Sequence, residues 1–318
     1  MGKTKYLVIS PCRNEAEYMR RTLDSMVAQT VRPDLWVIVD DGSTDETPQI
    51  LAEYVDKHDF IKIVPKANRG HRSVGPGVIE AFYCGYQAVR PDDFDFICKL
   101  DLDLELPPRY FEILLNRMKE NPRIGTCSGK PFFLDKKSGK LISEKCGNEN
   151  SVGMTKLFRK RCFDQIGGFV QQVMWDAIDG HRCRMLGWIA VSWDEPGLRF
   201  IHLRPMGSSQ QSMLTGRMRH GFGQYFMGTG LSYMTASALY RMTRPPYLLG
   251  GLGMWLGYAR SMLTRQQRLE DHGFRAFLRR YQWACLWRGK EKATEKLNRE
   301  RAAFWRPDAA ETIFTGKP

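Results

Sequence analysis

The chain has 318 residues with 42% hydrophobic and 12% aromatic content, which excludes a wholly disordered protein and allows one large core or two modest ones. Its formal net charge of +13 favours a negative partner: a phosphate compound, nucleic acid or an anionic membrane surface. The eight cysteines lack zinc-ligand or redox spacing, and the N-terminal apolar run is too short for a signal peptide. We therefore expect a reducing, cytoplasmic location.

Short runs rich in Val, Ile and Phe are typical of buried parallel strands, and they occupy residues 5–10, 35–40, 60–64 and 94–100. Apolar residues at helical spacing predict helices between them, over 16–27, 43–55 and 75–90. Ser43 or Thr44 is the expected N-cap of the second helix. This alternation predicts an α/β fold with a doubly wound parallel sheet, whose ligands bind at the carboxyl ends of the strands.

Each predicted strand runs into a polar or glycine-rich segment. These segments read "SPCRNEAE", "DDGSTDE", "KANRGHRSVGPG" and "DLDLELPP" in chain order. Any one of them alone is typical of a solvated turn. Because parallel strands end at the same edge of the sheet, the four together favour a binding site there.

The acidic triplet Asp101, Asp103 and Glu105 follows the fourth predicted strand at alternate positions. In an extended backbone these side chains would point to the same side, where like charges repel unless a cation lies among them. Hard oxygen ligands suit Mg²⁺ or Mn²⁺. A solvated acidic strand end is the alternative interpretation.

Five segments resemble successive motifs of family 2 glycosyltransferases with the GT-A fold: "VISPCRNEAEYMRRTLDSMVAQT", "WVIVDDGSTDETPQIL", "ANRGHRSVGPGVIEAFYCGY", "CKLDLDLELPPRYFEILL" and "KLFRKRCFDQIGGF". The resemblance spans roughly residues 5 to 205, and five motifs in the family's order are more specific than one Asp-x-Asp. It implies a Rossmann-like catalytic domain over 1–205. It also implies transfer of a sugar from a nucleotide donor to an acceptor, with inversion and with Mg²⁺ or Mn²⁺.

The resemblance assigns roles to the first two motifs. Pro11, Asn14 and Glu15 would form part of the floor under the nucleotide, and Asp40 and Asp41 would meet the base and ribose.

The fourth motif matches the family's metal-binding pattern. Asp101 and Asp103 would bind the metal and, through it, the donor diphosphate. "DLDLELPP" is also similar to the "DADLQHPP" form of polyprenyl-phosphate sugar transferases, in which the Gln binds metal, so Glu105 is a third candidate ligand.

The glycine-rich loop after the third strand carries His71 and Arg72. We expect this pair near the donor diphosphate, because the loop belongs to the same sheet edge and the helix over 75–90 begins beside it. Two solvated side chains of a loop are the alternative.

The segment "VMWDAIDGHRCRMLGW" takes the place where the family usually has Glu-Asp, but Trp175 replaces the Glu. Asp176 is the expected general base for a hydroxyl acceptor, and Asp179 is the reserve candidate. A helix N-cap is the alternative role for Asp176. Arg182 matches a family Arg and is expected to bind the donor.

A histidine at a later strand end resembles a His at the close of many GT-A domains. His202 would reach the metal or diphosphate there, or would be a packed core histidine.

Residues 206–318 change in composition and predict a helical extension rich in basic and aromatic residues. The helix expected over 272–290 has an apolar face typical of a helix lying in a membrane interface. This face comprises Phe274, Phe277, Leu278, Tyr281 and Cys285. Neither apolar stretch before it, over 221–240 and 245–259, is a convincing transmembrane helix. We expect peripheral association with the inner face of the plasma membrane; a helix packed on its own domain is the alternative.

The favoured function is a metal-dependent inverting glycosyltransferase that acts on a hydroxyl of a glycan or lipid-linked acceptor. A polyprenyl-phosphate acceptor and a non-catalytic sugar-nucleotide binder are the alternatives. The basic net charge also permits nucleic-acid binding, but no nucleic-acid module is recognised, so we expect no nucleic acid among the partners.

Overall fold

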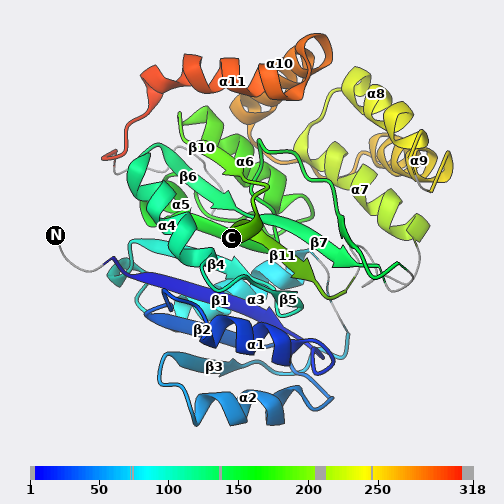
Figure 1. Cartoon of the computed structure of the whole chain (residues 1–318). Coiled ribbons are helices and arrows are strands. Elements are labelled where there is room, and N and C mark those ends of the chain that lie inside the picture. The colour runs from blue at the N-terminus through cyan, green and yellow to red at the C-terminus, as the bar shows by residue number, and fades with distance from the viewer. Residues whose placement is uncertain are drawn as a thin grey trace.

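The computed structural model describes residues 4–71, 73, 75–135, 138–204, 213–244 and 246–309. A seven-stranded sheet crosses the molecule, and helices cover both of its faces (Figure 1). The strand order is β10-β6-β9-β4-β1-β2-β3. The strands are β1 (Tyr6–Cys12), β2 (Leu35–Asp40), β3 (Ile61–Pro65), β4 (Phe96–Leu100), β6 (Ile124–Ser128), β9 (Thr155–Arg159) and β10 (Ile189–Ser192).

The sheet is mixed rather than wholly parallel, which corrects the prediction. β1 runs parallel to β2 and β4, but β9 is antiparallel to both β4 and β6. The chain reaches β9 through a second sheet instead of a crossover helix, so it enters from the carboxyl edge of β4. Residues at the amino end of β9 therefore lie beside the residues that follow β4.

Alternate residues of β1 serve two hydrophobic cores, as expected for a strand buried on both faces. Tyr6 and Val8 pack with α1 and α4, whereas Leu7 and Ile9 pack with α3, α5 and α6. The helices of this part of the chain are α1 (Met19–Val27), α2 (Thr47–Val55), α3 (Pro76–Gln87), α4 (Tyr110–Glu120), α5 (Lys160–Gln165) and α6 (Trp175–Met185), with short 3₁₀ turns at Pro91–Asp93 and Pro196–Leu198.

The predicted N-cap of the second helix is wrong, because α2 begins later than expected, with Glu46 at the cap. Ser43 and Thr44 instead belong to a loop that is tied to the loop after β1. Their hydrogen bonds to Asp40 and Asn14 replace a helical conformation.

A smaller sheet lies at the carboxyl side of β4, in the order β5-β11-β7-β8. Its strands are β5 (Leu104–Glu105), β11 (Arg199–His202), β7 (Lys130–Leu134) and β8 (Leu141–Ser143). β11 pairs antiparallel with β5, which aligns His202 with Leu104. This pairing brings the end of β11 to the acidic segment after β4.

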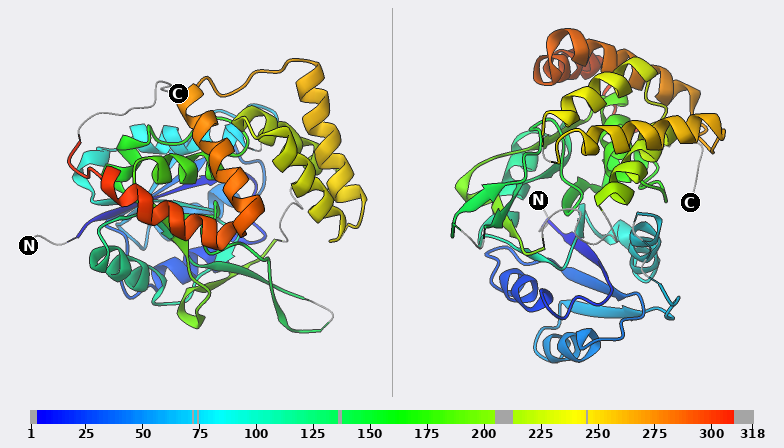
Figure 2. Two further views of the ribbon diagram at one scale, coloured as in Figure 1. Left: turned by 90° about the horizontal axis from the view of Figure 1, so that it is seen from above. Right: turned by 90° about the vertical axis from the view of Figure 1, so that its right-hand side faces the viewer.

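Helices follow the sheets: α7 (Met213–Met227), α8 (Leu231–Met242), α9 (Leu249–Leu263), α10 (His272–Arg288) and α11 (Lys290–Glu300), with a 3₁₀ turn at Arg301–Phe304. α8 and α9 lie side by side at the outer edge of the molecule, and α10 and α11 cover α6 and β10 (Figures 1 and 2). Among the described residues, no helix is both long and apolar enough to cross a membrane.

The apolar face of α10 packs against the protein, which corrects its assignment to a membrane interface. Phe274 and Leu278 are fully buried in a cluster with Ile178 of α6 and Phe226 of α7. Tyr281 and Cys285 are buried against α11. Periodicity identified this face correctly, but its partner is the chain's own helices.

Candidate active site

The carboxyl ends of β1, β2 and β3 meet at one edge of the large sheet. The strand register aligns Cys12 with Asp40 and Asp40 with Pro65. The Asp41 amide also donates to the Cys12 carbonyl at 2.8 Å. Pro11, opposite Val39 in this register, therefore lies directly beside the two aspartates.

Asn14 joins the loops that follow β1 and β2. Its φ of 53° is in the left-handed region, which Asn tolerates better than most residues. The Asn14 amide donates to Ser43 Oγ at 2.9 Å, and its Oδ1 accepts from the Thr44 amide at 2.8 Å. The adjacent Glu15 is buried, and its carboxylate pairs with Arg204 at 2.5 Å. The predicted nucleotide floor is thus a rigid, cross-linked surface.

Both aspartates of the second motif are buried and fixed. Asp40 accepts a hydrogen bond from the Ser43 amide at 2.9 Å. Asp41 pairs with Arg69 at 2.7 Å and with Lys66 at 3.2 Å. Gly42, which follows Asp41, has φ +72°, and a Cβ there would lie 2.4 Å from the Asn68 Cα, so only glycine lets the loops after β2 and β3 pack this closely.

The two aspartates after β4 have different surroundings. Asp101 is ion-paired with the buried Lys99, and its amide donates to the Met154 carbonyl at 2.8 Å. Asp103 Oδ2 lies 3.7 Å from His202 Nε2 and 3.9 Å from Arg204 Nε. The buried Asp103 Oδ1 has no hydrogen-bond partner among the described residues. An unpaired buried oxygen costs about 1–3 kcal/mol, so this atom is suited to an added cation.

The pKa values of Asp101 and Asp103 are shifted in opposite directions. Burial raises the pKa of Asp101, against the opposing effect of Lys99. Burial also acts on Asp103, but His202 and Arg204 hold the pKa of Asp103 below its usual value. Asp103 is therefore ionised at neutral pH.

His202 is held by a second carboxylate. Its Nδ1 lies 3.0 Å from Glu144 Oε1, which directs Nε2 towards Asp103. A carboxylate on one ring nitrogen is the usual support of a metal-binding His. Although burial favours the neutral ring, the contacts with Asp103 and Glu144 raise the pKa of His202 to about 9.

The third carboxylate of the triplet is directed elsewhere. Glu105 is ion-paired with Arg21 of α1, and only Leu104–Glu105 is a strand, so the predicted alternation does not extend over all three acids. Across the described parts of the chain, no three His, Cys, Asp or Glu side chains could hold a metal by themselves. Mg²⁺ commonly takes one or two carboxylates and completes its shell with substrate phosphates. Asp101 and Asp103, beside His202, fit such a partial ligand set.

Asp176 and Asp179 differ in exposure and in ion pairing, the two properties that decide whether a carboxylate can act as a base. Met174, with φ 65°, is the N-cap of α6, which excludes that role for Asp176. Asp176 is exposed, and its carboxylate makes no hydrogen bond or ion pair with any described residue. Asp179 is 1% exposed and paired with Lys156, and burial raises its pKa to about 7. Asp176 is therefore the carboxylate that is free to react.

Asp176 and Asp101 flank the same short segment before β9. The Gly153 carbonyl accepts from Lys99 at 3.0 Å, and Lys99 also pairs with Asp101. A Cβ at Gly153 would lie 3.1 Å from Asp176 Oδ2. The candidate base and the acidic pair thus belong to one site at the carboxyl edge of β4.

A family model described as glycosyl transferase family 2 matches residues 7–171, just over half of the chain. The chain belongs to glycosyl transferase family 2. Poly-beta-1,6-N-acetyl-D-glucosamine synthases of Staphylococcus epidermidis and Staphylococcus aureus (strain COL) are 27% and 26% identical to it over 128 residues. These alignments cover 40% of this chain but only 28% of each relative.

Solved structures show the GT-A fold. The mannosyltransferase PcManGT from Pyrobaculum calidifontis, in complex with GDP-Man and Mn²⁺, has a TM-score of 0.51 at 16% identity, over 95% of this chain and 86% of that one. Residues 1–349 of S. aureus TarS give 0.50 at 15% identity, over 95% and 83%. GalNAc-T7 with UDP, GalNAc and Mn²⁺ gives 0.55 at 14% identity, over 86% and 56%.

This family 2 glycosyltransferase carries two buried lysines that sequence patterns did not reveal. Lys99 and Lys156 are register partners across β4 and β9, and their side chains are 2% and 0% exposed. Each ammonium pairs with an aspartate and lies over the Trp175 ring, at 5.3 and 5.7 Å from its centroid. Trp175, which replaces the family's Glu, therefore stabilises two like charges that would otherwise repel one another.

The other donor-binding predictions have mixed outcomes. His71 is exposed, and its Nδ1 lies 3.1 Å from the Arg69 carbonyl. Arg72 lies outside the described residues. Arg182 is 2% exposed and donates to the Ile166 carbonyl at 3.0 Å, so it belongs to the core and does not reach the site. The family spacing located Arg182 on α6 but did not indicate which way its side chain points.

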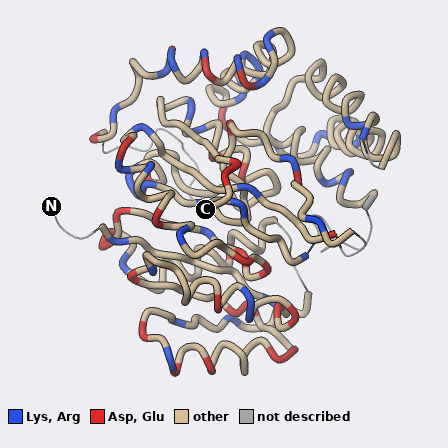
Figure 3. The backbone as a smooth tube through the Cα atoms, viewed as in Figure 1, with Lys and Arg blue, Asp and Glu red and all other residues tan. Residues whose placement is uncertain are grey.

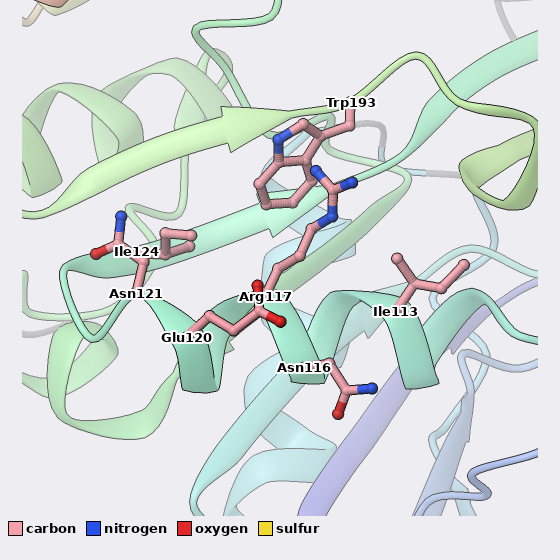
Figure 4. A pocket seen from close by; sticks show the side chains of 7 residues that line it. All are labelled: Ile113, Asn116, Arg117, Glu120, Asn121, Ile124 and Trp193. Atoms are coloured by element: carbon pink, nitrogen blue, oxygen red, sulfur yellow. The ribbon is translucent and has the colours of Figure 1, made fainter.

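A separate hollow lies between α4 and the strands β6 and β10 (Figure 4). Arg117 stacks on Trp193 there, 4.5 Å from the ring centroid, and also pairs with Glu195. None of the predicted site residues line it.

Proposed function

We propose that this glycosyltransferase moves a sugar from a nucleotide-sugar donor to a hydroxyl group of a glycan or lipid-linked acceptor, with inversion at the sugar carbon. The observation that carries the proposal is the exposed carboxylate of Asp176, which has no partner among the described residues and flanks the same Gly153 segment as Asp101. In the transfer, Asp176 takes the hydroxyl proton while the acceptor oxygen forms its bond to the sugar carbon. The bond to the diphosphate breaks on the opposite side, and the nucleoside diphosphate leaves.

The donor would lie along the cross-linked loops after β1 and β2. Asn14 and Glu15 fix the floor, and Asp40 and Asp41 lie where a nucleoside can be hydrogen-bonded. The first donor to test is UDP-GlcNAc, because the matched relatives are named as synthases of poly-N-acetylglucosamine and TarS was crystallised with UDP-GlcNAc. GDP-Man, the ligand of PcManGT, is the second.

A divalent ion, Mg²⁺ or Mn²⁺, would be held by Asp101 and Asp103 with His202 beside them. Such an ion neutralises the charge that develops on the departing diphosphate. The unpaired Asp103 Oδ1 supports this assignment, as do the Mn²⁺ ions in two of the structural neighbours. Glu144 would keep His202 oriented, and Lys99 would keep Asp101 in place.

The surroundings of Asp176 favour a hydroxyl acceptor over a polyprenyl phosphate. A phosphate attacks as an oxyanion, needs no base and would be repelled by a free carboxylate. A neutral hydroxyl needs that carboxylate.

The test compares Asp176→Asn with the wild type. Donor affinity is measured by calorimetry with UDP-GlcNAc and Mn²⁺, and transfer is measured by the release of UDP with glycan and polyprenyl-phosphate acceptors. We expect nearly unchanged donor affinity and a loss of transfer of roughly a hundredfold or more, the scale of a lost general base. Transfer by Asp176→Asn at the wild-type rate would refute the base assignment and favour the phosphate acceptor.

A further inference from the structure

Helix α9 buries its glycines, together with Met254 and Tyr258, and leaves its leucines and Trp255 exposed. Its buried face is rich in glycine and packs backbone to backbone on its neighbours: a Cβ at Gly257 would lie 2.1 Å from the Met218 carbonyl oxygen of α7, and one at Gly251 would lie 2.2 Å from the Ala238 oxygen of α8. Close glycine contacts of this kind are typical of helices packed in lipid. A helix in water normally shows the reverse arrangement.

The opposite face of α9 is exposed and carries apolar side chains from end to end, interrupted only by the exposed Arg260 among its described residues. Leu249, Leu256 and Leu263 are 63%, 46% and 79% exposed, and Leu252 and Trp255 lie between them. The turn before α9 adds Tyr247 and Leu248, at 64% and 67%. We call this stripe, residues 247–263, the α9 face. A contiguous exposed apolar surface of this kind indicates an interaction site.

The chain around the α9 face is basic and has no acidic residue. No Asp or Glu occurs from residue 196 to residue 269. Over residues 213–269 the charged side chains are all arginines: Arg217, Arg219, Arg241, Arg244, Arg260, Arg265 and Arg268. In Figure 3 the helices α8 and α9 accordingly carry blue positions and no red ones.

We propose that the α9 face binds the surface of an anionic lipid bilayer, with α9 lying in the plane of the interface. Apolar side chains flanked by arginines are the composition of an interfacial helix, and anionic headgroups attract each nearby basic residue. α9 has 15 residues and is about 22 Å long, shorter than the roughly 30 Å hydrocarbon core, so it lies on the membrane and does not span it.

A second copy of the chain is a poorer occupant. Two α9 faces brought together would place acid-free arginine clusters against one another, with no carboxylate between residues 196 and 269 to compensate them. Anionic headgroups remove this repulsion. The charge of the surroundings therefore favours lipid over self-association.

Packing contacts through α7 link α9 to the segment that carries the candidate base. α9 packs on α7. At Gly223, α7 in turn lies against Val173 and Met174, three and two residues before Asp176. A bilayer on the α9 face would thus be one helix away from the candidate base. The proposal does not depend on the transfer reaction, because lipid binding is measured without donor or acceptor.

Flotation of the full chain with liposomes tests the proposal. We expect binding to vesicles of equimolar phosphatidylcholine and phosphatidylglycerol, much weaker binding to phosphatidylcholine alone, and partial release in high salt, which screens exposed charges. Leu249→Asp/Leu256→Asp should lower the vesicle-bound fraction at least tenfold. Arg260→Gln/Arg265→Gln should lower it less and should reduce its salt dependence.

Val31→Asp is the matched control, because Val31 is also exposed but precedes β2 at the opposite end of the sheet. It should bind vesicles like the wild type, and all variants should keep the wild-type melting temperature since the changed side chains are exposed. Undiminished flotation of Leu249→Asp/Leu256→Asp, or equal binding to both vesicle types, would overturn the proposal. A lipid-free dimer that is detected by sedimentation, and that Leu249→Asp/Leu256→Asp dissociates, would also overturn the proposal.

Discussion

Lys156→Met tests whether Asp179 is a structural carboxylate and not a second base. The variant removes an ammonium that pairs with Asp179 at the centre of the molecule, where the two side chains are 0% and 1% exposed. It also removes the 2.6 Å hydrogen bond from Lys156 to the Asp176 carbonyl. Breaking a buried pair from one side typically costs about 3–5 kcal/mol, because the remaining charge loses its compensation.

For a chain of this size, each kcal/mol lowers the melting temperature by about 2–4 °C, so Lys156→Met should melt about 10 °C below the wild type. The double variant Lys156→Met/Asp179→Leu removes both charges and should recover most of this loss. Asp176→Asn, three residues away on the same helix, is the control: its exposed carboxylate has no described partner, and we expect a change within about 0.5 kcal/mol.

The loss in Lys156→Met should also depend on pH. Without the ammonium, burial alone keeps the pKa of Asp179 above its unfolded value, so the folded chain binds that proton more tightly. The stability of the variant should therefore fall as the pH rises from about 4, the unfolded pKa of an aspartate. Urea unfolding at several pH values measures this slope. A variant as stable as the wild type, or a double variant no better than the single one, would refute the reasoning.

Two further predictions concern the support of the site. Glu144→Gln should weaken Mn²⁺ binding in the presence of UDP by roughly 10–100-fold, because it loosens His202, whereas the exposed Glu53→Gln should not; calorimetry with both variants checks this. Equal Mn²⁺ affinity of the two would show that His202 needs no such support. Gly42→Ala should cost about 1–3 kcal/mol in urea unfolding, from its φ of +72° and its close approach to Asn68. Gly139→Ala, at φ +65° but with no atom of a described residue within 4 Å of the added Cβ, should cost less. An equal cost would show that the effect comes from φ alone.

Local sequence patterns predicted the part of the fold that is determined by neighbours along the chain. The four runs of Val, Ile and Phe correspond to β1, β2, β3 and β4, and the helix expected over 75–90 is α3. β9 was not anticipated as an antiparallel strand, because the buried Lys156, followed by Arg159 and Lys160, gives "TKLFRK" the composition of an exposed segment. The burial of Lys156 depends on Trp175 and Asp179 of α6, which do not belong to the local sequence pattern.

The positions of site residues could be predicted where they follow from a local motif. They could not be predicted where a residue depends on contacts with distant parts of the sequence. Asp101 and Asp103 follow a strand, so their location at the sheet edge could be expected. Glu144, in contrast, supports His202 across 58 positions of sequence, and Glu105 is drawn to Arg21 of α1. Neither contact has a local signal, since the first depends on the pairing of β7 with both β11 and β8, and the second depends on the packing of α1 against β5.

The helices α9 and α10 show why periodicity alone could not identify the exposed apolar surface. In α10 an apolar stripe alternates with arginines, a pattern that is equally typical of a helix on a membrane and of one packed on protein; Ile178 and Phe226 cover it. In α9 apolar residues surround the whole helix, so no stripe stands out in the sequence. What distinguishes its two sides is the position of the glycines: they are buried, with Met254 and Tyr258, because glycine can approach a neighbouring backbone more closely than leucine or tryptophan can. The packing of α7 and α8 on the glycines therefore directs the leucines and Trp255 of α9 outward. The membrane surface proposed for this chain is a consequence of this packing.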